Sequence, residues 1–368
     1  MSVQNRIGVA IAGLCITVAT SPAFALAQRT FVASYGNDAQ PCSLALPCRG
    51  FAAAIAATLP GGEVIVKDSA GYGTVTIAQS VSIVAPAGVY AGITIPGLGT
   101  GVTVNAPGGK VLLRGLTING QTSGQYGIWL QNGAELVVDR CAIANVKDAG
   151  VFVTAPGSAL TMTDTLVRYT LAGPGIRLNS DVRAALERVR ILRSVANLGI
   201  FADTSASVSI KDSLIAANFG GAVVVTALAG ATASLSITDS VLSDNRADAV
   251  KLTTQILAGT MAKGSVTGSM ITRSFSGQGI IVSSNPPANA SMSASGNLVS
   301  QNGNGMGTAG SGQLLSARDN TFSRNTQFAL TGNAGSPLHT VKGADGLPSN
   351  AGEQATPTSG TVTPVNPF

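Results

Sequence analysis

Residues 211–218 read KDSLIAAN and residues 238–245 read TDSVLSDN, so the chain repeats one pattern 27 residues apart. Related segments follow along most of the chain: RGLTING, DRCAIANV, TDTLVRYT, ERVRILRS, TGSMITRS, GNLVSQN and RDNTFSRN. Their shared apolar position recurs every 23 to 29 residues, at Ile118, Ile143, Val167, Ile191, Ile215, Leu242, Ile271, Val299 and Phe322. A period in the twenties indicates a solenoid, in which each repeat buries its apolar face only against its neighbours.

Each repeat contains short runs in which apolar and polar residues alternate, such as ALTMTD, GIRLN and SVSIKDS. Alternation with a period of two predicts strands, and the Gly, Asn, Ser and Pro residues between the runs predict turns. Leucine-rich repeats share this period, but their Leu-x-x-Leu-x-Leu signature is absent from the sequence. We therefore expect an all-β chain folded as a parallel β-helix solenoid of about 10–12 coils.

Two columns of polar residues flank the shared apolar position. Three residues after it stand Asn218, Asn245, Asn302 and Asn325, with Thr170, Ser194 and Ser274 in other repeats. Because Asn tolerates left-handed turns and amides about 4.8 Å apart can hydrogen-bond, we expect a stacked turn here. Three residues before it stand Arg140, Asp164, Arg188, Asp212 and Asp239. The first four alternate in sign, which favours surface pairing that fixes the register and contributes little energy.

The two ends of the chain differ from the repeats. Residues 1–27 have the order of a secretory signal peptide: Arg6, an apolar run, then small residues before a cut after Ala25 or Ala27. Residues 333–368 are rich in Gly, Pro, Ser and Thr without a period, which predicts a disordered tail. Residues 28–332 form the predicted β-helix domain. Within it RGFAAAIAATLP predicts a helix at about residues 49–58 that caps the first coil.

The cysteines and the net charge indicate in which compartment the protein works and which classes of partner it can bind. Removing the signal leaves Cys42 and Cys48, which close a short loop and are expected to form a disulfide, and Cys141, expected to be a buried free thiol. The net charge of +5 falls to +4 without Arg6, and the dense basic stripe of nucleic-acid binding is absent. No stretch after the signal reaches the roughly 18 apolar residues of a membrane span. We expect an exported protein that is periplasmic, cell-surface or extracellular.

The repeats resemble those of the right-handed parallel β-helix, or pectate-lyase-like, superfamily over roughly residues 30 to 330. The stretch TFVASYGNDAQPCSLALPCRGFAAAIAATLPGGEVIVKDSAGYG, with its paired Pro-Cys and its Gly-Gly-Glu-Val-Ile-Val, also resembles the entry segment of secreted bacterial β-helix proteins. The first resemblance rests on period and pattern and implies the fold, not an activity. The second implies no activity that can be carried over.

Catalytic patterns of β-helix enzymes find little support in the sequence. The only histidine, His339, lies in the predicted tail, which argues against the polygalacturonase motifs, a zinc site and a Ser-His-Asp triad. Pectate lyases use calcium held by carboxylates and an Arg or Lys base. The closest acidic group, Asp239, Asp244 and Asp248 around SDNRADAVK, is interpreted as a solvated turn, with a cation site as the alternative. No cofactor is predicted, and Ca²⁺ would be needed only by a lyase-like enzyme.

A more specific pattern lies in the strand after the Asn turn: GIWLQ, GVFVT, GIRLN and GIFAD. Strand alternation predicts an outward column of Trp129, Phe152, Arg177 and Phe201, then Val223, Lys251 and Ile281. A second outward column contains Gln131, Thr154, Asn179 and Asp203. Aromatic planes suit the C–H faces of sugars, and Arg177 suits a uronate carboxylate. The alternative is a structural cation–π ladder in which Arg177 stacks between Phe152 and Phe201.

Three functions remain open at this point. The leading hypothesis is a secreted or cell-envelope protein that binds polysaccharide along the outward aromatic column, without assignable catalysis. The second is a polysaccharide lyase or related carbohydrate-active enzyme, with Arg177 or Lys251 as base and Asp203 as the acidic partner. The third is an adhesin or structural surface spacer whose rigid stack is itself the function.

Overall fold

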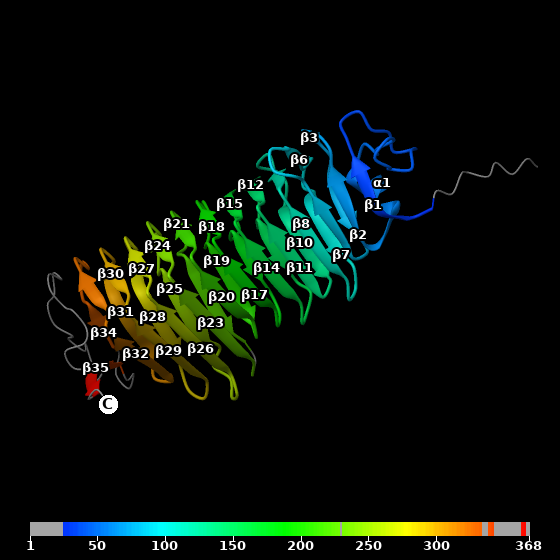
Figure 1. Cartoon of the computed structure of the whole chain (residues 1–368). Coiled ribbons are helices and arrows are strands. Elements are labelled where there is room, and N and C mark those ends of the chain that lie inside the picture. The colour runs from blue at the N-terminus through cyan, green and yellow to red at the C-terminus, as the bar shows by residue number, and fades with distance from the viewer. Residues whose placement is uncertain (1–24, 229, 333–337, 342–361, 366–368) are drawn as a thin grey trace, which may run out of the picture.

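Three parallel sheets wind along one axis in the computed structural model, which describes residues 25–228, 230–332, 338–341 and 362–365. The predicted right-handed parallel β-helix is confirmed, with about 10 coils. From β2 to β34 each coil contributes one strand to each sheet, and each strand pairs with the strand one coil away, as in β8–β11–β14. Figure 1 shows the stack with helix α1 at its N-terminal end and the strands of sheet B along its upper edge.

The strands are grouped here by sheet. Sheet A contains β1 (Ala27–Val32), β2 (Thr58–Val66), β5 (Val81–Val84), β8 (Lys110–Arg114), β11 (Glu135–Asp139), β14 (Ala159–Thr163), β17 (Arg183–Glu187), β20 (Ser207–Lys211), β23 (Thr232–Thr238), β26 (Met261–Thr267), β29 (Asn289–Ser295), β32 (Gln313–Arg318), β35 (Leu338–Val341) and β36 (Val362–Val365). Sheet B contains β3 (Ala70–Gly71), β6 (Ala91–Thr94), β9 (Leu116–Asn119), β12 (Ala142–Val146), β15 (Leu166–Thr170), β18 (Arg190–Leu192), β21 (Leu214–Ala216), β24 (Val241–Ser243), β27 (Met270–Thr272), β30 (Leu298–Ser300) and β33 (Thr321–Ser323). Sheet C contains β4 (Val75–Ile77), β7 (Thr100–Asn105), β10 (Tyr126–Asn132), β13 (Val151–Val153), β16 (Ile176–Leu178), β19 (Ile200–Thr204), β22 (Val223–Ala227), β25 (Val250–Thr254), β28 (Gln278–Ser284), β31 (Asn304–Gly310) and β34 (Leu330–Thr331).

The shared apolar position of the repeats is the core column of sheet B. Its members pair from coil to coil, from Ile118 at one end to Phe322 at the other. None of them is more than 1% exposed. Because side chains alternate across a strand, this inward column also determines which residues of each coil face solvent.

Two columns of left-handed backbone bound sheet B. The predicted charge column occupies the first, since Arg140, Asp164, Arg188, Asp212 and Asp239 all have φ between 48° and 52°. Only Arg188 and Asp164 of these five form an ion pair from coil to coil in the described chain, and both are exposed, so the pair contributes little. The second column, between sheets B and C, contains Asn145, Tyr169, Arg193, Ala217, Asp244, Arg273, Gln301 and Arg324.

The predicted asparagine ladder is present, with one correction to its geometry. The left-handed residue is the one before each ladder asparagine, so Asn218 and Asn245 themselves turn inward and are at most 1% exposed. Asn245 Oδ1 accepts from the backbone N–H of Asn218 at 3.1 Å and from its Nδ2 at 3.0 Å, while Asn245 Nδ2 donates to Ile215 O at 3.1 Å. The amides thus satisfy buried backbone groups that the turn leaves without strand partners.

A short helix and a disulfide lie at the N-terminal end of the stack. Helix α1 (Phe51–Ala56) buries Phe51, Ala54 and Ile55 over the first coils. The helix ends before Pro60, which lies in β2, because the chain is already extended from Thr58. The disulfide between Cys42 and Cys48 is present, and backbone hydrogen bonds of 2.8 and 2.9 Å tie both cysteines to Phe31 of β1.

The predicted terminal segments lie largely outside the described residues. Of the predicted signal peptide, only residues 25–27 are described, and β1 starts at Ala27. Within the predicted tail, β35 and β36 form two short strands that continue sheet A, and the remaining residues of that segment are not described. No helix in the described chain is long and apolar enough to cross a membrane.

Candidate functional site on sheet C

Glycines control how the chain enters sheet C. Gly150, Gly175 and Gly199 each directly precede a strand of this sheet, and Gly127 is the second residue of β10. A Cβ added at Gly150 would lie 2.3 Å from Val167 Cγ1 and 2.8 Å from the carbonyl oxygen of Gly175, so no larger residue fits without a shift. This close approach fixes the register, and the residue two positions after the glycine faces outward.

The outward column of sheet C follows that register. Trp129, Phe152, Arg177 and Phe201 are direct neighbours on successive strands, as predicted. The column continues through Val224, Lys251 and Ile281. The prediction of Val223 in this column is wrong, because Val223 pairs with the inward Ile200 and is fully buried. The error arises because Ala222 accepts the hydrogen bond of the Ile200 N–H, where the three preceding coils use Gly150, Gly175 and Gly199.

Three aromatic rings form a cluster at the N-terminal end of the column. The Trp129 and Phe152 rings are stacked at 5.9 Å, and the Tyr126 ring lies 5.3 Å from Trp129 and 4.9 Å from Phe152. Trp129 Nε1 donates to Thr154 Oγ1 at 3.0 Å. Tyr126 is not among the residues that strand alternation predicts for the outward columns. The missed signal was its position directly before an entry glycine, where its side chain can lean across the strand.

Burial and charge act on the Tyr126 phenol. Its pKa is raised first by burial among the rings and then by the nearby Asp148 carboxylate, with which it also shares a hydrogen bond. Gln125 Nε2 donates to the same hydroxyl at 3.2 Å. The phenol is therefore held neutral and oriented at one end of the aromatic cluster.

Arg177 stacks on one side only. Its guanidinium carbon lies 5.2 Å from the centre of the Phe152 ring, and its Nε donates to Asn179 Oδ1 at 3.2 Å. No cation–π contact joins it to Phe201 within the described chain, so the two-sided ladder proposed as the alternative is only half formed. Its terminal amino groups make no hydrogen bond to any described residue and remain available as donors.

The remaining predicted residues surround this column without converging. Gln131, Asn179, Asp203 and Lys251 are all half-buried on sheet C. Asp203 Oδ1 accepts from Thr204 Oγ1 at 3.2 Å. Within the described chain neither Arg177 nor Lys251 forms an ion pair with Asp203, so the grouping that a lyase would need is not joined by contacts.

The acidic residues around SDNRADAVK also lie apart. Asp244 accepts from Arg273 Nη2 at 2.6 Å, and this hydrogen bond lowers the pKa of Asp244. Asp248 Oδ1 accepts from the backbone N–H of Gln278 at 2.8 Å, while Asp239 lies in the other turn column. Among residues the structure describes, no group of three or more His, Cys, Asp or Glu is arranged to hold a metal ion.

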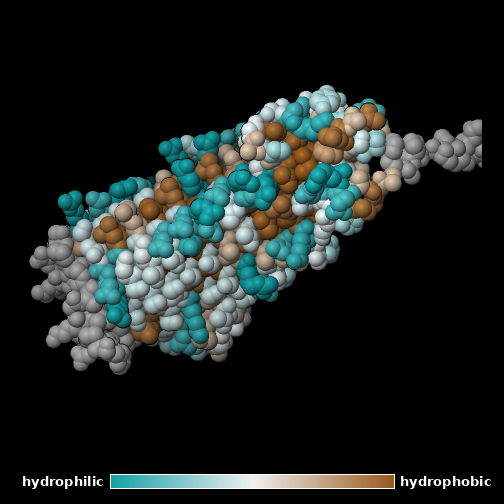
Figure 2. All heavy atoms as spheres, in the orientation of Figure 1, coloured by the Kyte–Doolittle hydropathy of each residue, from teal (hydrophilic) through white to brown (hydrophobic). Residues whose placement is uncertain are grey.

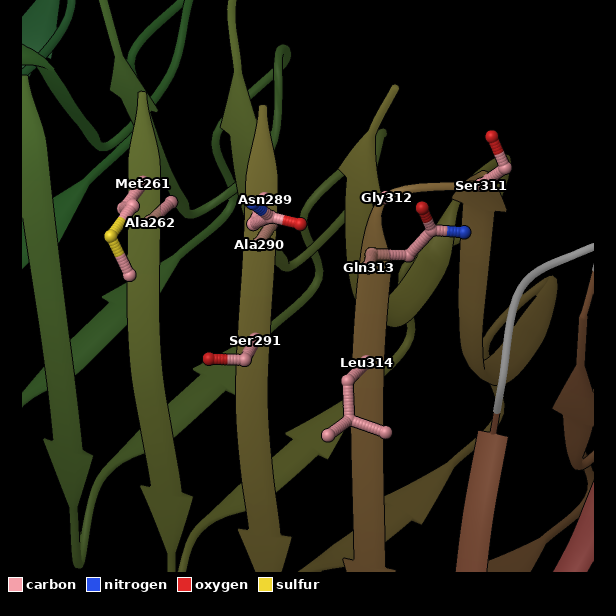
Figure 3. A pocket seen from close by; sticks show the side chains of 9 residues that line it. All are labelled: Met261, Ala262, Asn289, Ala290, Ser291, Ser311, Gly312, Gln313 and Leu314. Atoms are coloured by element: carbon pink, nitrogen blue, oxygen red, sulfur yellow. The ribbon is translucent and has the colours of Figure 1, made fainter. Parts of the chain in front are cut away.

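Sheet A presents a different surface. Figure 2 shows a face that is hydrophobic toward the N-terminal end and pale toward the C-terminal end. In the C-terminal half the outward column of sheet A is a run of serines, from Ser209 through Ser236 and Ser265 to Ser293. A shallow pocket of about 280 Å³ lies there, lined by Met261, Ala262, Asn289, Ala290, Ser291, Ser311, Gly312, Gln313 and Leu314 (Figure 3). None of these residues is charged or aromatic, so the candidate site stays on sheet C.

Comparison with known proteins agrees with the fold. Residues 100–267 match the family model described as the right handed beta helix region. Among solved structures, pectate lyase Pel9A is 16% identical, with a TM-score of 0.56 over 93% of this chain and 83% of that chain. The A-module of the mannuronan C-5 epimerase AlgE4 from Azotobacter vinelandii is 14% identical, with a TM-score of 0.54 over 82% of this chain and 91% of that chain. No curated protein matches the sequence. At these identities the likeness establishes the fold alone.

Proposed function

We propose that this right-handed parallel β-helix is an exported protein that binds an acidic polysaccharide along the sheet C strip. The sheet C strip is defined by Trp129, Phe152, Arg177 and Phe201, with Gln131, Asn179, Asp203 and Lys251 beside them. The observation that carries the proposal is the clustering of Tyr126, Trp129 and Phe152 next to Arg177, whose terminal donors have no protein partner among the described residues.

The strip has the groups that a sugar chain needs. Successive strands are about 4.8 Å apart, so side chains of neighbouring coils can contact one extended chain. The half-exposed Trp129 offers an aromatic face, the amides of Gln131 and Asn179 suit hydroxyls, and the Arg177 fork suits a carboxylate. Pectate and mannuronan, named in the two similar structures, are both acidic polysaccharides, which supports this class of ligand.

Export is part of the proposal. The disulfide between Cys42 and Cys48 suits an oxidising compartment, and residues 1–27 have the pattern of a signal peptide. A periplasmic, cell-surface or extracellular location would also place the strip among glycans.

Catalysis on the same polysaccharide is the alternative that the fold likeness favours. A lyase would generate an unsaturated product, which absorbs in the ultraviolet. Incubation with polygalacturonate and with polymannuronate, with and without Ca²⁺, would reveal it. No new absorbance is expected, because Arg177 hydrogen-bonds to Asn179 and no ion pair joins it to Asp203 in the described chain.

Trp129 is the only tryptophan, so its fluorescence reports on the strip. The test titrates the protein with oligogalacturonate, oligomannuronate and neutral oligosaccharides. We expect a saturable shift with one acidic oligosaccharide, weakened at least tenfold in Arg177→Ala, since one charge-assisted contact is worth about 1.5–3 kcal/mol. Arg183→Ala is the matched control, because Arg183 lies in the same coil but is exposed on sheet A. A flat response to every oligosaccharide would reject the strip and favour the structural-spacer function.

A further inference from the structure

A second hollow lies outside sheet C, at the turns that join sheets B and C. Its volume is about 480 Å³, and it is lined by Tyr169, Arg193, Ser194, Val195, Ala217, Asn218, Phe219, Asp244, Arg246 and Phe275. We call the outward side chains Tyr169, Arg193, Val195, Phe219, Arg246 and Phe275 the turn surface. The sequence pattern does not identify it, because all of these residues except Tyr169, which lies in β15, occupy turn positions where no alternation operates.

The turn surface exposes large apolar side chains on a rigid floor. Val195, Phe219 and Phe275 are 51%, 48% and 64% exposed. Each of these residues directly follows a buried polar residue of the column that contains Asn218, Asn245, Ser194 and Ser274. Its backbone N–H donates to the carbonyl oxygen of that column's residue one coil away, as Phe219 N does to Ser194 O at 3.0 Å. The backbone is therefore held while the side chains point outward. Several exposed apolar side chains gathered at one hollow favour a bound partner.

Two guanidinium groups stack on this surface without a carboxylate. The Arg246 guanidinium carbon lies 4.5 Å from the centre of the Phe219 ring, and that of Arg193 lies 5.5 Å from the Tyr169 ring, to whose hydroxyl Arg193 also donates. Neither arginine forms an ion pair with a residue of the described chain. The one acidic residue in the lining, Asp244, forms an ion pair with Arg273. The hollow therefore carries unneutralised positive charge and suits an anion.

We propose that the turn surface is a second binding site, which takes a carboxylated oligosaccharide such as a uronate oligomer. Phe219, Arg246 and Phe275 are the corresponding residues of three successive coils, so the backbone positions of the two phenylalanines lie about 9.6 Å apart, two strand spacings, with Arg246 in the coil between them. That distance is on the scale of two linked sugar rings. Sugar C–H faces pack on the rings, and Arg246 binds the carboxylate through its planar fork.

An acidic peptide fits this surface less well. A peptide gains affinity from backbone hydrogen bonds to an open strand edge. The floor of the turn surface already uses its backbone N–H groups between coils, since those of Phe219, Arg246 and Phe275 donate to Ser194, Asn218 and Asn245. The surface therefore presents rings and guanidinium groups rather than an open edge. The proposal does not depend on the sheet C strip, because the two sets of residues do not overlap.

The test is isothermal titration calorimetry with oligogalacturonate in an Arg177→Ala background, where binding to the strip is weakened. We expect saturable binding that persists in this background, weakens at least tenfold on adding Arg246→Ala, and weakens similarly on adding Phe275→Ala. Phe275 is well exposed, so its removal leaves the fold intact. Adding Arg183→Ala, a guanidinium of sheet A, is expected to change nothing.

Other outcomes overturn the proposal in recognisable ways. No heat in the Arg177→Ala background, together with a normal Trp129 response in the parent protein, leaves a single site on the strip. Equal affinity for a carboxyl-reduced, neutral oligomer rejects the role of charge. Equal affinity for polyglutamate of matched length assigns the surface to acidic peptides. A flat Trp129 response with intact calorimetric binding rejects the strip while leaving the turn surface in place.

Discussion

The sheet C strip and the turn surface combine the same chemistry, aromatic rings with arginines, at opposite degrees of exposure. Phe152 of the strip is 8% exposed because Trp129, Tyr126 and Arg177 pack on it. Phe275 of the turn surface is largely open to solvent. Within a strand column, neighbours about 4.8 Å away on both sides cover each other. At a turn, the side chains diverge and their rings stay open.

This difference assigns different physical roles to the two surfaces. In the strip, much of the aromatic area is already buried before any ligand arrives, so the rings stabilise the coil stack and hold Arg177 in place. On the turn surface the rings contribute little to folding and keep their apolar area for a partner. Removing an aromatic ring should therefore lower the stability of the fold when the ring belongs to the strip. At the turn surface, removing a ring should lower only ligand binding.

The largest expected loss in the free energy of unfolding comes from the buried asparagine ladder beneath the turn surface. Asn245→Ala removes the acceptor for the backbone N–H of Asn218 and the donor for Ile215 O, both buried. Each unsatisfied buried group costs about 1–3 kcal/mol, so we expect a loss of about 3 kcal/mol in the free energy of unfolding. Urea unfolding followed by far-ultraviolet circular dichroism measures it.

The control for this substitution is an exposed amide stack. Asn132 Nδ2 donates to Asn105 Oδ1 at 2.8 Å, but Asn132 is open to solvent. Asn132→Ala leaves groups that water can satisfy, so a change within about 0.5 kcal/mol is expected. Equal losses for the two variants would show that the ladder owes its effect to amide stacking itself rather than to buried backbone groups.

The next effect compares the two phenylalanines directly. Phe152→Ala removes a nearly buried ring from contact with three partners, and we expect a loss of about 2 kcal/mol in the free energy of unfolding. Phe275→Ala removes an exposed ring, and a change within about 0.5 kcal/mol is expected. The comparison fails if Phe275→Ala is as destabilising as Phe152→Ala, because the turn surface would then be part of the fold's packing.

Sequence patterns predict the two regions unequally, for a physical reason. Repeat period and strand alternation suffice for the core column and for Trp129, Phe152, Arg177 and Phe201, because inward and outward positions follow from the pleat. They misplace Val223, since Ala222 occupies a position that glycine holds elsewhere. Turn residues such as Phe219 and Phe275 obey no alternation, and their exposure depends on which side chains neighbouring coils bring beside them.

A smaller effect appears in the strip at high pH. The pKa of Tyr126 is raised above 10.0 by burial and by Asp148, so the folded state favours the neutral phenol. Its contribution to stability is complete below about pH 10 and is lost as the pH rises through the folded pKa. Because the Trp129 ring lies 5.3 Å away, tyrosinate formation should quench its fluorescence with a midpoint above pH 10, and Tyr126→Phe should remove that step. A quenching midpoint at or below pH 10 would contradict this, because it would show that the Tyr126 phenol is fully exposed to solvent.

The smallest effect lies at the turn surface at low pH. Arg273 lowers the pKa of Asp244 below 3.8, so the pair's stabilisation is present above about pH 4 and is lost as the pH falls through the folded pKa. Because both side chains are about 40% exposed, solvent screening limits it to less than about 1 kcal/mol. Asp244→Asn should therefore lower the free energy of unfolding slightly at pH 7, and wild type and variant should converge as the pH falls through the folded pKa of Asp244.

The same substitution separates the two surfaces in binding. Asp244→Asn removes the one carboxylate from the lining of the hollow at the turn surface and frees Arg273, so oligogalacturonate should bind there about two- to fivefold more tightly. The Trp129 response should not change, because Asp244 lies in the turn and outside the sheet C strip. Calorimetry in the Arg177→Ala background and fluorescence in the parent read the two sites separately. Weaker calorimetric binding in Asp244→Asn would mean that the Asp244–Arg273 pair shapes the site, and charge balance alone would then not explain its preference for anions.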